Sequence, residues 1–121
     1  MNWKFNHPIM SDKKYNLQQL EELAGGNTDF VNSMVETFLE YTPGQLQEML
    51  NAHKEQKMDV LGAVAHKIKP NIDLFEISEI RNDIRLIEEH GKNNLNTPEL
   101  KASLDRLEVV LNKVFKQLEQ R

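Results

Sequence analysis

Apolar residues recur every three or four positions along most of this chain. In the C-terminal segment, leucine and valine form an uninterrupted seam on one helical face, at positions 100, 104, 107, 111, 114 and 118. No segment alternates apolar and polar residues over a useful length, and no short internal repeat is visible. A period of roughly 3.6 residues is typical of amphipathic helices, whereas half-buried strands show a period of two. The pattern therefore predicts an all-α protein and makes strands and solenoids poor interpretations.

A length of 121 residues leaves room for one hydrophobic core and one domain. Hydrophobic side chains make up 39% of the chain, which is enough for a stable globular fold. The first residues mix Trp3, Phe5, His7 and Pro8 without a period. We therefore expect an irregular N-terminal arm over residues 1–14 and one helical domain over residues 15–121.

Capping residues, glycines and prolines divide this domain into helices, which we expect over residues 17–24, 28–53, 58–75, 79–90 and 98–118. The expected N-caps are Asn16 (in a capping box with Gln19), Asn27 or Thr28, Ser78 and Thr97, and the expected stops are Gly25-Gly26 and His90-Gly91. Pro43 predicts a kink or a restart, and Pro70 a kink. Four main amphipathic helices joined by short loops imply an antiparallel four-helix bundle with a short additional N-terminal helix.

The residues present exclude several kinds of site. The chain has no cysteine, so it has no disulfide, thiolate metal site or cysteine nucleophile. Di-metal centres of helical bundles use Glu-x-x-His, but the residues three positions before the four histidines are Lys4, Leu50, Ala63 and Ile87. None of the five glycines begins a phosphate-cradling loop followed by Lys and Ser or Thr. We therefore expect no resident metal or cofactor and no phosphorylation from ATP by this chain alone.

Charge and hydropathy bear on partners and location. With 19 acidic and 15 basic residues, the net charge of −4 argues against a nucleic-acid binder that depends on bulk positive charge. The longest apolar or small stretch, residues 60–65, is far too short to span a bilayer, and residues 1–10 lack the apolar run of a signal peptide. We expect a cytoplasmic protein with no nucleic acid or membrane as partner.

Four histidines are candidates for chemistry, and three of them have a simpler interpretation. His7 lies in the irregular arm, while His53 and His90 fall near helix C-termini, where an imidazole interacts favourably with the helix dipole. His66 differs because it falls in the middle of the 58–75 helix, about 130° from the mean direction of the apolar stripe. Its ring should therefore face solvent.

Small or compact residues lie near His66 on the same side of the expected helix. Gly62 and Ala63 precede it by one turn, and Pro70 follows it by one turn. Gly62, at about 90° from the core direction, has two interpretations. It lets a neighbouring helix approach closely, or it leaves room for a partner protein to reach the ring. We favour the second interpretation.

Two lysines flank His66. Residues 64–72 contain Lys67 and Lys69 and no acid, which gives a local charge of +2 in a chain of net charge −4. An anion would settle at such a site. Two nearby ammonium groups also disfavour the imidazolium form, which helps to keep a ring nitrogen free for nucleophilic attack. The alternative is an ordinary solvated helix face.

Residues 65–70, Ala-His-Lys-Ile-Lys-Pro, resemble the phosphoacceptor motif of histidine-containing phosphotransfer domains, which reads His-x-apolar-Lys and usually continues with Gly. Residues 17–43 resemble the start of the same family in their Leu-rich turn, Gly-Gly stop and long helix that ends near Thr-Pro. The resemblance covers roughly residues 15–118. Pro70 stands where the family usually has Gly, and Glu76 where a second Gly is common.

The resemblance implies a phosphorelay intermediate. His66 would accept a phosphoryl group from the aspartyl phosphate of a response-regulator receiver domain, such as that of a hybrid sensor kinase, and pass it to another receiver. Nε2 is the expected nucleophile, Lys69 the main cation for the phosphoryl oxygens and Lys67 a second, flanking cation. Mg²⁺ and an acidic pocket would come from the receiver.

The expected docking surface for the receiver comprises Gly62, Ala63, Pro70 and Asp73, and we expect the chain itself to be a monomer. A different class stays open, namely a non-catalytic helical-bundle adaptor or scaffold in which His66 is an ordinary surface residue. An enzyme with its own active site has little support, because no nucleophile triad, inward carboxylate pair or cofactor motif is identifiable by spacing.

Overall fold

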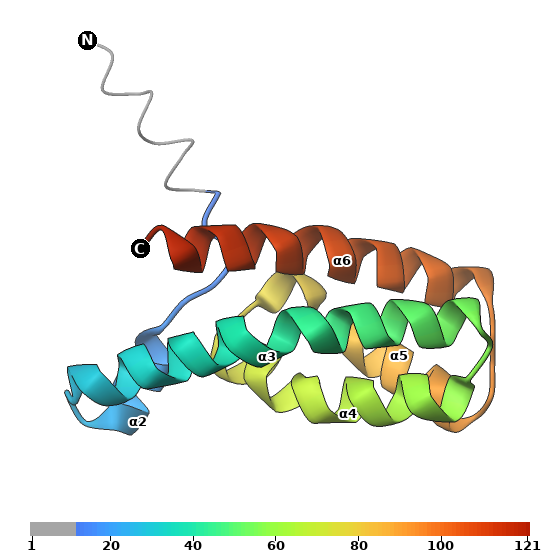
Figure 1. The fold of residues 1–121 in the computed structure, drawn as a ribbon, viewed down its shortest axis with the longest axis horizontal. Helices are drawn as coiled ribbons and strands as arrows, with labels where there is room; N and C mark the ends of the chain where they lie inside the picture. The colour runs from blue at the N-terminus through green and yellow to red at the C-terminus, as the bar shows by residue number, and fades with distance from the viewer. Residues whose placement is uncertain (1–11) are drawn as a thin grey trace, which may run out of the picture.

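The computed structural model describes residues 12–121, and these residues form helices without any strand. The elements in chain order are α2 (Gln18–Ala24), α3 (Thr28–Lys54), α4 (Met58–Leu74), the 3₁₀ turn η2 (Ser78–Ile80), α5 (Arg81–Lys92) and α6 (Pro98–Glu119). Successive helices from α3 to α6 run antiparallel, and α2 lies against the first half of α3 (Figure 1). The predicted all-α bundle with a short additional N-terminal helix is confirmed. The predicted arm over residues 1–14 lies mostly outside the described residues.

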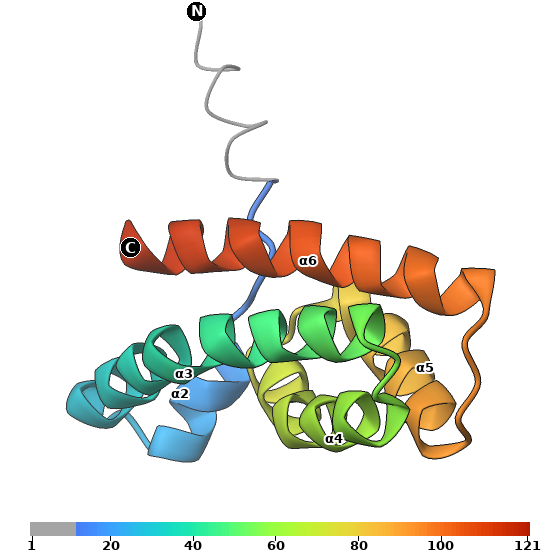
Figure 2. The ribbon, with the colours of Figure 1, turned by 45° about the vertical axis from the view of Figure 1, so that its right-hand side comes forward.

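The four longer helices form a square arrangement. Helices α3 and α5 each contact both α4 and α6, so that α4 and α6 lie at opposite corners (Figure 2). The seam between α4 and α5 is therefore on a face of the bundle away from α6. This seam carries the residues that the sequence singles out.

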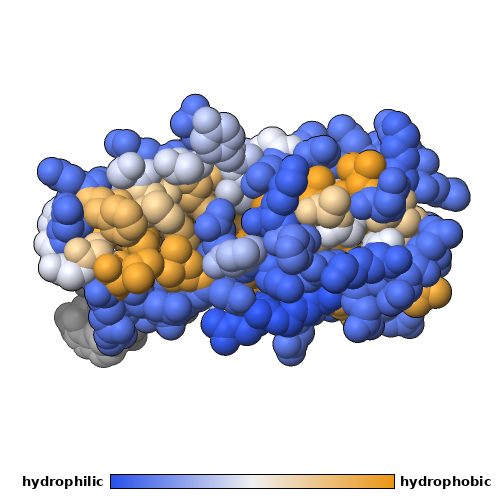
Figure 3. Space-filling view, turned by 90° about the horizontal axis from the view of Figure 1, so that it is seen from below, coloured by the Kyte–Doolittle hydropathy of each residue, from blue (hydrophilic) through white to orange (hydrophobic). Residues whose placement is uncertain are grey.

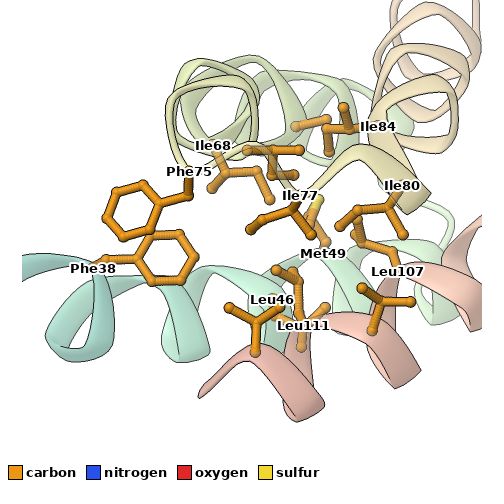
Figure 4. Packing of buried hydrophobic residues seen from close by; sticks show 14 of the residues in the cluster. Phe38, Leu46, Met49, Ile68, Phe75, Ile77, Ile80, Ile84, Leu107 and Leu111 are labelled. Carbon is orange, nitrogen blue, oxygen red and sulfur yellow. The ribbon is translucent and has the colours of Figure 1, made fainter. Parts of the chain in front are cut away.

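The core fixes the rotation of α4. Phe38 of α3 stacks on Phe75 at the end of α4, with ring centroids 4.5 Å apart (Figure 4). Ile68 and Ile72 of α4 are completely buried, and each such side chain contributes about 1.5–3 kcal/mol when removed from water. All six seam residues of α6 are buried as well. With its apolar stripe held in this way, α4 presents its other side to solvent.

Several predicted helix ends are confirmed. The side chain of Asn27 accepts a hydrogen bond from the backbone N–H of Phe30 at 3.1 Å, and that of Thr97 accepts one from Leu100 at 3.2 Å. Gly25 ends α2 in the left-handed conformation, with φ of 60°. Helix α4 begins at Met58 and continues past Pro70 to Leu74.

Other predicted boundaries are corrected. Of the two alternatives predicted at Pro43, a kink or a restart, the restart is wrong, because α3 is continuous from Thr28 to Lys54 and bends near its middle (Figure 2). Ser78 does not cap α5 but begins η2, and α5 starts at Arg81 without a side-chain cap. Helix α5 also does not stop at His90-Gly91 but runs to Lys92, because Gly91 serves a packing role described below.

The start of α2 also differs from the expected capping box. Leu17 is the N-cap residue, and Asn16 accepts a hydrogen bond from the backbone N–H of Gln18 instead. The carboxylate of Glu76 accepts the next backbone N–H, from Gln19, at 3.3 Å. Glu76 itself has a φ of 48°, in the left-handed region that favours glycine. The Glu at this position therefore combines backbone strain with a contact to α2 that glycine could not make.

Candidate functional site

Helices α4 and α5 meet in backbone contact at two glycines. Gly62 of α4 and Gly91 of α5 are both buried, and a Cβ atom added at Gly91 would lie 2.5 Å from Cα of Gly62. A Cβ atom at Gly62 would lie 3.0 Å from the backbone nitrogen of Lys92. Side chains at these positions would push the helices apart, so close helix approach accounts for both glycines. The favoured interpretation, in which Gly62 leaves room for a docking partner, is therefore wrong, and the alternative of close helix approach holds.

His66 lies one turn beyond Gly62 on α4 and faces solvent, as its rotation predicted. Its side chain is 67% exposed, whereas Ala65 and Ile68 beside it are completely buried. Its Nδ1 atom lies 2.6 Å from Oε2 of Glu88, which belongs to α5. The ring is therefore anchored at one nitrogen, and Nε2 is the other.

Glu88 is a buried carboxylate that joins His66 to two lysines. Its Oε1 accepts a hydrogen bond from Nζ of Lys69 at 2.7 Å, and Nζ of Lys92 lies 3.7 Å from its Oε2. The hydrogen bond from Lys69 is the main cause that lowers the pKa of Glu88 from 4.5 to about 2, against the opposing effect of burial. His66 and Lys92 lower this pKa further. Glu88 is ionised at neutral pH.

The ionised carboxylate selects one tautomer of His66. Glu88 has no proton to donate, so its short contact requires a proton on Nδ1 of the ring. In the neutral ring the lone pair available for attack is then on Nε2. This assignment is inferred from the hydrogen-bond partners. The environment of two lysines expected from the sequence is thus incomplete, because the carboxylate of Glu88 contacts both Lys69 and the ring.

Three lysines flank His66, of which the sequence singled out two. Lys69 is 27% exposed and points toward Glu88, on the core side of His66 as its rotation predicted. Lys67 is exposed and lines a hollow beside the ring. Lys92 borders the same hollow from α5. The positive charge at the site therefore comes from two helices.

The hollow has a volume of about 590 Å³ and lies where α4 and α5 cross. It is lined by Asp59, Gly62, Ala63, His66, Lys67, Gly91 and Lys92. Ala63 and Pro70 are exposed, in agreement with the expected surface near His66. Seen from the side of α2 and α4, the surface is mostly hydrophilic, and its widest apolar area lies toward the α2 end (Figure 3). The hollow beside the His66 ring is therefore separate from that apolar area.

Asp73, expected on the docking surface, lies two turns beyond His66 near the end of α4. Its Oδ2 accepts a hydrogen bond from Nη2 of Arg85 at 2.7 Å, and Nε of Arg81 lies 3.5 Å from its Oδ1. The hydrogen bond to Asp73 raises the pKa of Arg85. Asp73 is therefore partnered by α5 within the bundle.

Two other histidines lie at helix ends, as predicted. His53 is in the last turn of α3, with Nε2 3.2 Å from Oδ1 of Asn96. His90 is in the last turn of α5, with Nδ1 3.1 Å from the carbonyl oxygen of Leu86. Neither lines the hollow beside His66. His7 lies outside the described residues.

Sequence reasoning missed Glu88 and Lys92. A signal for Glu88 exists, because it follows Ile84 by one turn and is adjacent to Ile87 on the inward face of α5. An acid at such a position requires a partner when it is buried. The identity of that partner depends on how α4 and α5 cross.

No protein-family model, curated protein or solved structure matches the chain. Within residues 12–121, no group of three or more His, Asp or Glu side chains is arranged to hold a metal ion. No helix in this part of the chain is long and apolar enough to cross a membrane. Fold and geometry define an all-α bundle with an exposed histidine anchored by a buried carboxylate.

Proposed function

We propose that this chain is a histidine phosphotransfer protein of a two-component phosphorelay. His66 accepts a phosphoryl group from the aspartyl phosphate of one receiver domain and passes it to the aspartate of another. The observation that carries the proposal is the exposed imidazole with Nδ1 anchored 2.6 Å from a buried, ionised carboxylate. The resemblance of residues 65–70 to the phosphoacceptor motif supports the same function.

The chemistry requires no proton movement at His66. Nε2 attacks phosphorus in line, the P–O bond to the partner's aspartate breaks, and the aspartate leaves as a carboxylate. The ring becomes a positively charged phosphoimidazolium, and its Nδ1–H stays hydrogen bonded to Glu88. In the onward transfer the ring leaves as neutral imidazole with the same proton in place. Glu88 acts as a positioning residue that also stabilises the charged ring.

The lysines neutralise the transferred group. A phosphoryl group on Nε2 adds negative charge to a chain of net charge −4, so local cations are needed to favour it. Lys69 is held beside the ring by Glu88, and Lys67 and Lys92 border the hollow next to it. Mg²⁺, which would supply further charge neutralisation in the reaction, belongs to the acidic pocket of the receiver in this proposal. The chain contributes the nucleophile, its orientation and the ammonium groups.

The direct test is phosphotransfer from receiver domains of the same organism, loaded with acetyl phosphate in the presence of Mg²⁺. We expect the chain to take up label that is stable in base and labile in acid, and the His66→Gln variant to take up none. The His53→Gln variant, altered at a helix-end histidine, is the matched control and should be labelled normally.

Phosphoramidate, a small phosphoryl donor that needs no docking surface, separates the two classes of protein. A phosphotransfer protein should be labelled at His66 by this donor and by at least one receiver. An adaptor bundle would bind receivers and remain unlabelled by all of them. The second result would overturn the proposed function.

A further inference from the structure

A cluster with surplus positive charge lies at the far end of the α4–α5 seam. Arg85 donates to Oδ2 of Asp73 at 2.7 Å through Nη2 and to the carbonyl oxygen of Arg81 at 3.0 Å through Nη1. Nε of Arg81 lies 3.5 Å from Oδ1 of Asp73, a buried atom that has no hydrogen-bond partner within the described part of the chain. Two guanidinium groups thus share one carboxylate, and the side chain of Arg81 is 45% exposed.

This cluster lies within reach of any protein that docks over His66. Asp73 follows His66 by two turns, so it lies on the same face of α4 and about 10 Å further along the helix axis. A partner of standard size covers about 800 Å² of surface, which corresponds to a disc of about 16 Å radius. A disc of that size centred on His66 includes Asp73 and the arginines that contact it.

Docking over the cluster would remove a surplus cation from water. Such a loss of hydration is costly unless the partner supplies an anion at the same place. The planar fork of a guanidinium group matches a carboxylate and can bind both of its oxygens. A partner with a carboxylate opposite Arg81 is therefore favoured, and one with Lys or Arg there is rejected.

Resting on the proposed function, we propose that Arg81, with Arg85 and Asp73, determines which receiver docks. The cluster binds a carboxylate side chain on the receiver surface, at the place that lies over the end of α4 when the aspartate that carries the phosphoryl group faces His66. Asp73 acts as a positioning residue, because it holds Arg85 and leaves the surplus charge on Arg81. In this proposal Arg81 and Arg85 make the direct partner contact that the sequence led us to expect at Asp73.

The test compares Arg81→Gln and Arg81→Glu with the unaltered chain, using the receiver domain that transfers fastest to that chain. Both variants should fold, because Arg81 is exposed and is the first residue of α5, where an acid interacts favourably with the helix dipole. Lys113→Glu, an exposed change of equal charge on α6, is the matched control. Phosphoramidate labelling of His66 is measured for every variant.

We expect Arg81→Glu to lower kcat/KM for the receiver about ten-fold or more, through KM, and Arg81→Gln to have a smaller effect. The difference in kcat/KM between Arg81→Glu and the unaltered chain should shrink as the salt concentration rises from about 0.05 M to about 0.5 M, because salt screens exposed charges. Labelling by phosphoramidate should stay normal, and so should receiver transfer to Lys113→Glu. A receiver variant with one surface acid changed to Lys should restore transfer to Arg81→Glu.

The possible failures are distinguishable. Equal receiver kinetics for Arg81→Glu and the unaltered chain would overturn the specificity role while leaving the proposed function intact. An equal loss with Lys113→Glu would show a general charge effect and would overturn it as well. No labelling of the unaltered chain by phosphoramidate or by any receiver would overturn both proposals.

Discussion

Replacing Glu88 by Gln removes the charge beside His66 and keeps a side chain of the same size. In the folded protein the pKa of Glu88 falls from 4.5 to about 2, which corresponds to ~3 kcal/mol in favour of the ionised carboxylate. Lys69 accounts for the largest part, and the contact to the His66 ring contributes as well. Hydrogen bonds to a charged group contribute about 1.5–3 kcal/mol, against about 0.5–1.5 kcal/mol for a neutral acceptor such as the Gln amide, so the weaker contact in the transition state should slow transfer about ten-fold.

The assay measures single-turnover phosphorylation of His66 by a loaded receiver, and the deficit should lie in the rate at saturating receiver. Glu89→Gln, an exposed neighbour on α5, is the matched control and should transfer normally. Nitrogen NMR of the ring gives an independent measure. The unaltered chain should show the proton on Nδ1, and Glu88→Gln should show a mixture of tautomers. A folded Glu88→Gln variant with an altered tautomer ratio and an unchanged transfer rate would refute the reasoning.

Four further outcomes are expected. His66→Gln should abolish labelling and leave the circular dichroism spectrum unchanged, with only a small fall in melting temperature from the altered contact to Glu88, because the side chain is exposed. Lys69→Ala should slow transfer about 10- to 100-fold and more than Lys67→Ala, because Lys69 contacts Glu88 and Lys67 does not; equal rates would contradict this order. Gly91→Ala should lower the free energy of unfolding by about 1–3 kcal/mol despite its better helix propensity, since its Cβ would lie 2.5 Å from backbone; a rise in melting temperature would contradict the packing argument. Because folding lowers the pKa of Glu88, ionised Glu88 should stabilise the folded protein fully above about pH 4.5, and this contribution should be lost as the pH falls toward 2. The melting temperature of Glu88→Gln should therefore fall less steeply with acid than that of the unaltered chain.

The periodicity of α4 was enough to predict which way His66 points. The apolar residues of that helix leave one consistent core direction, and burial of Ile68 and Ile72 makes the structure follow it. The same reasoning correctly placed Lys69 nearer the core than Lys67. These predictions depend only on contacts within one helix and on its hydrophobic side.

Contacts between helices could not be predicted in the same way. The pairing of His66 with Glu88 depends on the crossing of α4 and α5, which the backbone contact of Gly62 and Gly91 permits. One sequence shows that each glycine is present but not that the two touch. The stop expected at Gly91 failed for this reason, because the glycine that resembles a C-cap lies inside α5.

The glycine contact has a consequence for engineering. Gly62 and Gly91 bring main chain against main chain one turn from the reacting ring, so no side-chain rotamer sets the spacing of the two helices there. The orientation of His66 by Glu88 is therefore insulated from changes at exposed positions such as Ala63 and Lys67. A library randomised at Ala63 should redirect the chain to new receivers while its labelling by phosphoramidate stays constant, whereas changes at Lys67 should also slow that labelling.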